Sequence, residues 1–273
     1  MVNLAPLNKQ RMNLDLKGKT AIVCGSTQGL GYASAVEIAL LGANVILMAR
    51  NEEKLDTAKN NLDTSKGQQH DYLVADFSSV THVKEAISQF LTKKLTVHLL
   101  VNNTGGPAGG SILGAKEEEF LQAFQSHLLC NQILVQALVP GMKAANYGRI
   151  VNIISTSVKQ PIPGLGVSNT IRAAVANWSK TLAGELGKYG ITVNNVLPGF
   201  TQTVRADYVI KKKAADTGKP EAEIVANLIN EIPAGRMGIP EEFGAVVAFL
   251  CSPAAGYING INLPVDGGRT LSL

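Results

Sequence analysis

The sequence predicts one α/β domain with a doubly wound, seven-stranded parallel sheet and helices on both of its faces. Two observations lead to this fold class. Short runs of β-branched and aliphatic residues recur along the whole chain, and longer amphipathic segments separate them. This alternation is typical of βαβ units, in which each connecting helix returns the chain to the same end of a parallel sheet.

Seven segments are predicted to be strands, because each is a short apolar run bounded by turn or polar residues. They are residues 20–24, 43–49, 71–76, 97–103, 148–154, 190–198 and 260–266. Amphipathic helices are predicted over residues 32–42 and 83–91. A long helical segment covers residues 116–146, and Pro140 inside it predicts a kink or an end at that position.

The chain shows no internal repeat and no low-complexity linker, so a single domain over residues 14–273 is expected. Residues 1–13 are interpreted as an N-terminal extension. Residues 200–235 are rich in Lys, Glu and Ala and follow the sixth predicted strand. We expect this segment to be helical and to lie over the carboxyl end of the sheet as a substrate lid.

The composition restricts the partners and the compartment. A hydrophobic content of 45% with 17% charged residues fits a compact soluble protein, and a net charge of +4 is too small to suggest nucleic acid binding. No apolar run approaches ~18 residues and the start lacks a signal-peptide pattern, so no membrane association is expected. Cys24, Cys130 and Cys251 have neither paired nor metal-ligand spacing, which indicates buried thiols, a reducing cytoplasm and no metal site.

The first predicted strand runs into the sequence CGSTQGLG, in which Gly25, Gly29 and Gly31 are spaced G-x-x-x-G-x-G before a helix. Glycines here let the backbone approach a pyrophosphate held against the amides at the start of that helix. A tight turn alone would also explain the glycines. Their position between a strand and an amphipathic helix favours a dinucleotide site, to which Ser26 and Leu30 also belong.

Two polar residues bear on the identity of the dinucleotide. Arg50 follows the second predicted strand, where a carboxylate would favour NAD(H); a guanidinium suits a 2′-phosphate, so NADP(H) is preferred. The alternative is that Arg50 simply faces solvent. Asp76, followed by Phe77, ends the third predicted strand and is placed either to bind the adenine amino group or to cap the next helix.

Five stretches of the chain together resemble a known family. They are CGSTQGLG, LLVNNTGG, GRIVNIIS, ITVNNVLPGFTQT and NGINLPVDGG. Their order and spacing resemble the short-chain dehydrogenase/reductase family over about residues 14–268, with a layout similar to 3-oxoacyl-[acyl-carrier-protein] reductases. The resemblance implies a nicotinamide cofactor and a homotetramer or dimer that packs through helices around 116–146 and 166–188.

The resemblance also assigns cofactor contacts in two further loops. One loop borders the cofactor after the fourth strand, and the other closes over the nicotinamide carboxamide after the sixth. The matching residues are Asn103, Thr104 and Gly105 in the first loop and Pro198, Gly199, Thr201 and Thr203 in the second.

Catalysis in the family rests on four residues, Asn, Ser, Tyr and Lys. The Ser binds the substrate carbonyl, the Tyr hydroxyl transfers the proton, and the Lys holds the nicotinamide ribose and lowers the Tyr pKa from ~10. In this chain Ser155 matches the Ser. Ser168 stands at the Tyr position, Arg172 at the Lys position and His127 at the Asn position, so three of the four residues differ.

These differences remove the usual proton donor. Ser168 cannot replace a tyrosine as an acid, and losing a general acid typically costs ~10²–10⁴ in rate. Arg172 can still bind ribose hydroxyls, but it cannot relay a proton. One hypothesis is that His127, whose unperturbed pKa is ~6.5, replaces the acid through a water and Ser155; the alternative is a structural histidine satisfied by its neighbours.

Two classes of function follow from the sequence. The first is an NADP(H)-dependent oxidoreductase that reduces a carbonyl, or oxidises an alcohol, of a small or acyl-type substrate through a non-standard proton donor. The second is a catalytically silent NADP(H)-binding protein that senses the cofactor or acts as a partner subunit.

Overall fold

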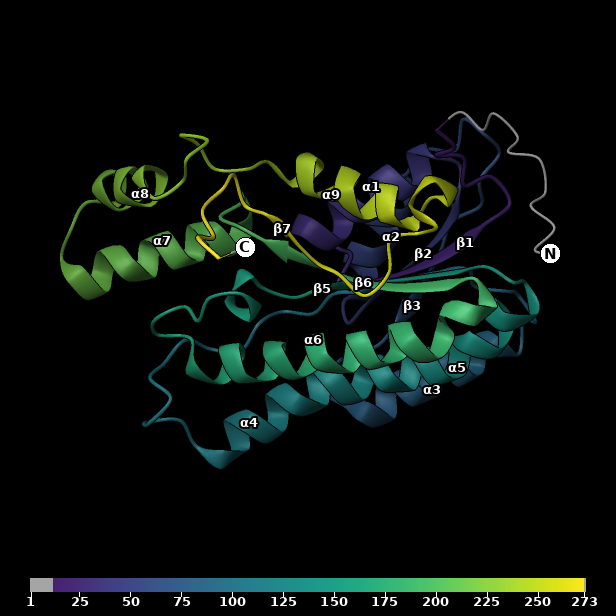
Figure 1. The fold of residues 1–273 in the computed structure, drawn as a ribbon, viewed down its shortest axis with the longest axis horizontal. Coiled ribbons are helices and arrows are strands. Elements are labelled where there is room, and N and C mark those ends of the chain that lie inside the picture. Colours follow the sequence, from purple (N-terminus) through teal and green to yellow (C-terminus); the bar gives the residue numbers. More distant parts are fainter. Residues whose placement is uncertain (1–11, 273) are drawn as a thin grey trace, which may run out of the picture.

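Seven parallel strands form the centre of the molecule, and helices cover both faces of their sheet (Figure 1). The computed structural model describes residues 12–272. The strands are β1 (Thr20–Cys24), β2 (Asn44–Ala49), β3 (Asp71–Val74), β4 (Leu99–Asn102), β5 (Gly148–Ile153), β6 (Ile191–Pro198) and β7 (Asn262–Val265). Their order is β3-β2-β1-β4-β5-β6-β7. The predicted fold class is confirmed, and every strand lies within a predicted segment.

The helices form two layers, which Figure 1 shows above and below the sheet. The upper layer contains α1 (Gly29–Leu40), α2 (Glu52–Asn60) and α9 (Pro240–Cys251); the lower layer contains α3 (Val80–Leu91), α4 (Glu117–Phe124), α5 (Cys130–Ala144) and α6 (Gly166–Leu186). Each layer packs on the sheet through its own apolar cluster. Burial on both faces explains why the strands are almost continuously apolar.

A ladder of four asparagines crosses the carboxyl half of the sheet. Asn102 Nδ2 donates to Asn152 Oδ1 at 2.8 Å, Asn152 Nδ2 to Asn195 Oδ1 at 3.0 Å, and Asn195 Nδ2 to Asn262 Oδ1 at 2.7 Å. Each pair is also in register between neighbouring strands. Asn152 Nδ2 also donates to Ser179 of α6. Because a one-residue slip would turn these side chains to the other face, the ladder fixes the register of β4 to β7.

The long helical segment contains an irregular turn that the sequence does not reveal. A π-helix, η1 (Gln125–Leu129), separates α4 from α5. Pro140 lies inside α5, which continues to Ala144, so the predicted end at Pro140 is wrong. Pro140 and Gln136, whose carbonyl loses its helical partner, are both exposed, so water can replace the missing bond.

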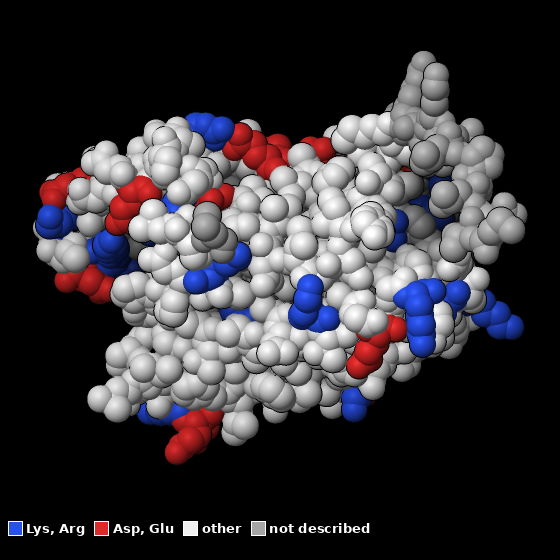
Figure 2. All heavy atoms as spheres, in the orientation of Figure 1, with Lys and Arg blue, Asp and Glu red and all other residues white. Residues whose placement is uncertain are grey.

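The predicted lid is helical. Helices α7 (Val204–Thr217) and α8 (Glu221–Asn230) follow β6 and lie together beyond the sheet at the left of Figure 1. They share a small cluster of their own, centred on Ile210, Ile224 and Leu228. Basic and acidic side chains alternate over this part of the surface (Figure 2). Short 3-10 helices complete the fold: η2 (Thr156–Val158), η3 (Gly187–Tyr189) and η4 (Pro253–Ala255).

Residues 1–11 of the predicted extension lie outside the described residues. The chain already contacts the domain at Asn13, whose carbonyl accepts a hydrogen bond from Ala254 N at 2.9 Å. Cys24, Cys130 and Cys251 are free and buried, as expected. Within residues 12–272, no helix is both long and apolar enough to cross a membrane.

Candidate active site

Gly25 and Gly31, in and after the loop between β1 and α1, leave no space for a Cβ. Gly25 and Gly29 have left-handed φ angles of +57° and +59°. A Cβ on Gly31 would lie 2.3 Å from the carbonyl oxygen of Gly25 and 2.6 Å from Asn103 Nδ2. A Cβ on Gly25 would lie 2.6 Å from the Asn103 carbonyl oxygen. The loop therefore needs glycine for both its conformation and its packing.

Protein contacts also hold this loop in place. Gly25 N donates to Met48 O at 2.8 Å, and the buried Ser26 Oγ accepts from Met48 N at 3.1 Å. Asn103 Nδ2 donates to Gly25 O at 3.1 Å, which joins the loop to the end of β4. Leu30 packs against the apolar cluster above the sheet. The side chains of Ser26 and Leu30 thus shape the loop, and its backbone faces any ligand.

The adenine end of the predicted site contains Arg50 and Asp76. Arg50 is exposed directly after β2. Asp76 Oδ1 accepts from Ser78 N at 2.9 Å, and this bond, with a smaller contribution from the Arg50 charge, holds the Asp76 pKa below its ordinary value. The N-cap of α3 is Ser79, so the predicted capping of that helix by Asp76 is wrong. Phe77 is buried between these residues and the core.

The segment after β6 reaches back to the glycine loop. Gly199 packs so closely on β7 that a Cβ there would lie 2.4 Å from Asp266 Cα. Thr201 is buried, and Thr203 caps α7 by accepting from Ala206 N. A Cβ on Gly29 would lie 3.7 Å from Thr203 Cγ2. The start of α1, at the end of the glycine loop, and the segment after β6 therefore lie against each other at the carboxyl end of the sheet, where Pro198 ends β6.

Ser155 and Ser168 lie on the two segments that follow β5. Ser155 Oγ accepts from Ser157 N at 3.0 Å, which leaves its hydroxyl proton free to donate. Helix α6 begins at Gly166, so Ser168 lies in its first turn and Arg172 one turn later on the same face. The predicted catalytic residues are thus placed on one helix and on the adjacent strand end.

Arg172 is a buried cation. Its exposed fraction is 7%, and its Nη1 donates to the carbonyl of Ile153, the last residue of β5, at 3.2 Å. A Cβ on Gly106 would lie 3.7 Å from Arg172 Nη2, so the guanidinium reaches the loop after β4. Its Nε is buried without a hydrogen-bond partner. Burial lowers the Arg172 pKa to about 10, so the group stays charged at neutral pH.

Within residues 12–272, Arg172 also lacks a carboxylate counterion. The ion pairs of the described residues all involve other side chains. Burying an unpaired charge is costly, because the protein interior replaces the solvation of water poorly.

His127 lies in the middle of η1 and is 2% exposed. Its Nδ1 is 2.5 Å from Thr104 Oγ1. Burial lowers the His127 pKa to about 3, and the charge of Arg172 adds to the effect. The imidazole is therefore neutral at pH 7, which contradicts the hypothesis that His127 gives up a proton as an imidazolium. The alternative, a histidine satisfied by a neighbouring side chain, is the arrangement observed.

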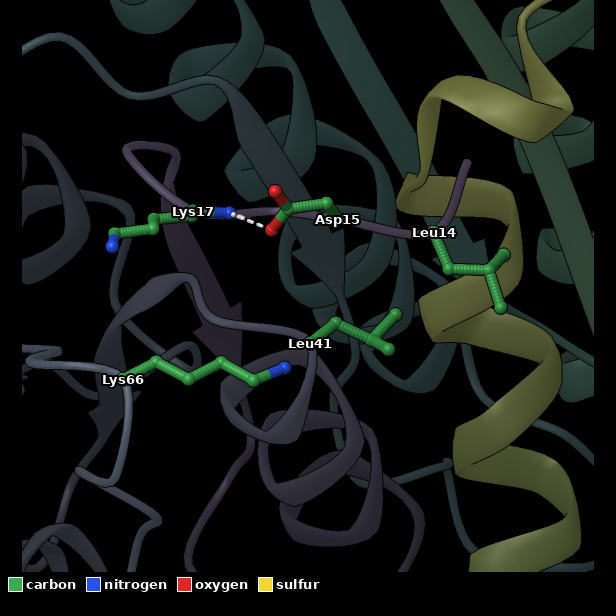
Figure 3. A pocket seen from close by; sticks show the side chains of 5 residues that line it. All are labelled: Leu14, Asp15, Lys17, Leu41 and Lys66. Carbon is green, nitrogen blue, oxygen red and sulfur yellow. Dashed lines mark hydrogen bonds between the residues drawn. The ribbon is translucent and has the colours of Figure 1, made fainter. Parts of the chain in front are cut away.

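The structure shows one hydrogen-bond pair and one pocket that the sequence does not indicate. Thr104, expected to border the cofactor, hydrogen-bonds through its hydroxyl to His127, and no local sequence pattern indicates this pair. A pocket of about 470 Å³ lies at the amino ends of the strands, away from every predicted site residue (Figure 3). It is lined by Leu14, Asp15, Lys17, Leu41 and Lys66. Among residues 12–272, no cluster of His, Cys, Asp and Glu is suited to a metal ion.

Comparisons with known proteins give this site its context. Residues 25–270 match a family model described as enoyl-(acyl carrier protein) reductase. The chain belongs to the short-chain dehydrogenase/reductase family. It is 34% identical to 3-oxoacyl-[acyl-carrier-protein] reductase FabG of Haemophilus influenzae, over 94% of this chain and 100% of the relative. The same reductase of Pseudomonas aeruginosa is also 34% identical, over 95% of this chain and 100% of its own length.

Solved structures of reductases share the fold of this short-chain dehydrogenase/reductase. L-sorbose reductase from Gluconobacter frateurii, complexed with NADPH and L-sorbose, superposes with a TM-score of 0.89 at 30% identity, covering 96% of this chain and 100% of that one. YwfH, an NADPH-dependent reductase involved in bacilysin biosynthesis, superposes with a TM-score of 0.88 at 26% identity, covering 93% of this chain and 99% of that one. The chain is thus an oxidoreductase of this family with NADPH-bound structural neighbours.

The residues of this chain fit a nicotinamide dinucleotide. The glycine loop holds a tight backbone conformation in which a Cβ at Gly25 or Gly31 would clash with the Asn103 or Gly25 carbonyl. Helix α1 has no side-chain cap and no acidic residue in its first turn, so its first amides can bind a phosphate. At the other end of the site, Nη2 of Arg172, which has no hydrogen-bond partner among residues 12–272, can donate to a ribose hydroxyl or to an anion.

Proposed function

We propose that this protein is an NADP(H)-dependent carbonyl reductase, also able to run the reverse alcohol oxidation, whose substrate proton comes from water rather than from a phenol. The observation that carries the proposal is the combination of a complete glycine cradle with Ser155 and a charged Arg172 at the same edge of the sheet. The substrate is a small or acyl-type carbonyl compound. The neutral state of His127 supports water as the proton source.

Different residues along the carboxyl end of the sheet bind the different parts of the cofactor. The amides of the glycine loop and of the α1 N-terminus bind the pyrophosphate, Arg50 binds the 2′-phosphate and Asp76 the adenine. The loops after β4 and β6 border the nicotinamide. Arg50 carries the preference for NADP(H) over NAD(H), because an exposed guanidinium directly after β2 attracts the extra phosphate.

The protein side chains then polarise the substrate. Bound NADPH would supply a hydride to the carbonyl carbon and become NADP⁺, while the carbonyl oxygen takes up a proton. Ser155 Oγ donates a hydrogen bond to that oxygen, and the Arg172 charge stabilises the negative charge that develops on it. Ser168 is too short to reach the oxygen as a phenol does, so it orients a water in the space left free.

Kinetics of a restored variant test this proposal. NADPH oxidation is followed against a panel of carbonyl compounds for the native chain and for Ser168→Tyr/Arg172→Lys. We expect slow native turnover and a rate about 10²–10⁴ times higher in the double variant, because the phenol and its activating lysine return. Adding Ser155→Ala to the double variant should abolish the gain. Absence of saturable NADPH and NADH binding, measured by nicotinamide fluorescence, would contradict the proposal.

A second candidate is a catalytically silent NADP(H)-binding protein that senses the cofactor or pairs with an active homologue. The buried, neutral His127 and the missing phenol favour it. Saturable NADPH binding without any native turnover, together with strong activity in the restored variant, would decide for this candidate.

We also infer a cytoplasmic homo-oligomer, a dimer or tetramer, formed through α4, α5 and α6. Apolar side chains on α4 support this, since Leu121 is 61% and Phe124 38% exposed in the single chain. Light scattering coupled to size exclusion tests it. A single species with the mass of one chain would contradict the proposal.

A further inference from the structure

The starting point is the missing counterion of Arg172. Only one of the five guanidinium N–H groups has a bond, from Nη1 to the carbonyl of Ile153, among the described residues. A buried guanidinium in this state is under-satisfied, and no carboxylate of the described part of the chain forms an ion pair with it. His127, its titratable neighbour, is neutral and cannot balance the charge. A ribose hydroxyl could accept one of the free N–H groups, but only an anionic ligand would also balance the charge.

The first turn of α6 offers further donors on the same face. Gly166 N donates to Gly110 O, whereas the amides of Val167 and Ser168 have no acceptor within residues 12–272. The N-cap is Leu165, which has no capping group, and the first turn contains no acidic residue. The positive end of this 21-residue helix is thus uncompensated. Ser168 adds a hydroxyl one turn before Arg172.

The pyrophosphate of the cofactor is not the group that meets these donors. Its cradle is the glycine loop at the start of α1, which covers the upper face of the sheet, whereas α6 covers the lower face (Figure 1). Arg172 instead donates to the carbonyl of Ile153, two residues before Ser155, and Ser155 binds the substrate carbonyl under the proposed function. The anion is therefore part of the substrate.

We propose that the substrate is an oxo acid with its carboxylate one or two carbons from the carbonyl, and that Arg172, Ser168 and the first amides of α6 bind this carboxylate. The assignment of a substrate rests on the proposed function; the anion site itself does not. A planar guanidinium matches a carboxylate with two parallel hydrogen bonds, and one positive charge balances one negative charge. The shortening of Tyr to Ser at position 168 provides the space that the carboxylate occupies.

Binding of a matched pair of small probes tests the site without turnover. Isothermal titration calorimetry compares 2-oxobutanoate with its neutral analogue 2-oxobutanamide, for the cofactor-free chain and for the chain saturated with NADP⁺. We expect the native chain to bind the acid about ten-fold or more tightly than the amide. Arg172→Gln should make the two affinities equal, and Arg172→Lys should keep part of the difference. Lys188→Gln, the same charge change beyond the far end of α6, should leave the difference intact.

The outcomes separate the two proposals. Equal affinity of the native chain for acid and amide overturns the carboxylate site, as does an acid preference that survives in Arg172→Gln. Circular dichroism checks the fold of each variant; if Arg172→Gln does not fold, Arg172→Met takes its place and must also lose the preference. An acid preference that persists in a chain without saturable NADPH binding supports the anion site while the proposed function fails.

Discussion

Two buried arginines donate to carbonyls at opposite ends of β5, Arg149 from the strand itself and Arg172 from α6, and they differ in how many partners they have. Arg149, at the start of the strand, is 5% exposed and donates to the carbonyls of Ser252, Gly148 and Gly190. Its guanidinium also stacks on Tyr147 with 4.2 Å to the ring centroid. Arg172, at the end of the strand, has one carbonyl partner and an unpartnered Nε.

The difference in hydrogen bonding indicates a structural role for Arg149 and a ligand-binding role for Arg172. At the amino end of β5, backbone carbonyls of the protein accept hydrogen bonds from the buried Arg149 guanidinium and stabilise its charge. At the carboxyl end, it keeps a charged group unsatisfied at the edge where parallel α/β sheets bind their ligands. An unsatisfied buried donor is therefore more informative about the site here than a buried charge by itself.

The largest effect on stability is expected at Arg149. Arg149→Met removes the hydrogen bonds to the carbonyls of Ser252, Gly148 and Gly190 and the stacking on Tyr147. We expect the free energy of unfolding to fall by about 3–5 kcal/mol. Urea denaturation followed by circular dichroism measures it. A loss below about 1 kcal/mol would mean that these hydrogen bonds contribute little and that the contrast with Arg172 is not energetic.

The glycine loop gives the next largest effect, and it concerns binding. Gly31→Ala places a Cβ 2.3 Å from the Gly25 carbonyl oxygen, so the loop must move away from its pyrophosphate-binding shape. We expect NADPH affinity to fall by about 100-fold or more. Gly184→Ala, on α6 with nothing within 4 Å of its Cβ, is the matched control and should bind NADPH as the native chain does. Unchanged binding in Gly31→Ala would exclude the loop as the cradle.

Arg172→Met is expected to raise the free energy of unfolding, whereas Arg149→Met lowers it. Methionine keeps the volume but removes an unpaired buried charge, so we expect the cofactor-free protein to become more stable by about 1–3 kcal/mol. The same denaturation experiment measures it, and Arg149→Met is the paired control because there the identical change destabilises. A destabilised Arg172→Met would show that the native fold needs the guanidinium for its own stability.

The strands and the glycine cradle were predictable from the sequence because both depend on local patterns. Buried parallel strands are apolar runs, and residues such as Gly25 and Gly31 mark a backbone that nothing larger fits. The family pattern likewise placed Ser155, Ser168 and Arg172 in order along the chain.

Properties that depend on distant contacts were not predictable. The state of Arg172 follows from a carbonyl nineteen residues earlier and from the loop after β4. The low pKa of His127 follows from its burial in a π turn that has no sequence signal. The cap of α3 was misassigned to Asp76, since Asp and Ser are equally good N-caps and Ser79 is only three residues away.

His127 makes the catalytic end of the site sensitive to acid. Its pKa is about 3 in the folded chain and ~6.5 unfolded, so below pH 6.5 the unfolded state takes up the proton first and stability falls. We expect this residue to cost about 2 kcal/mol between pH 7 and pH 5. His127→Asn, which introduces the usual family residue, should remove this pH-dependent loss of stability. Denaturation of both proteins at the two pH values measures it; parallel losses would contradict the buried, neutral histidine.

Arg50 is expected to give the smallest effect, because it is an exposed arginine whose charge is screened by water. Arg50→Glu replaces the proposed 2′-phosphate ligand by a carboxylate that repels the phosphate and can bind ribose hydroxyls. We expect NADPH affinity to fall about ten-fold and NADH affinity to rise, with the unfolding free energy unchanged. Fluorescence titration with both nucleotides measures the ratio. Lys54→Glu, an equal charge reversal one helical turn away on α2, should leave that ratio unchanged. If it shifts the ratio as much as Arg50→Glu, the preference arises from the general field of this surface and not from a direct contact with the phosphate.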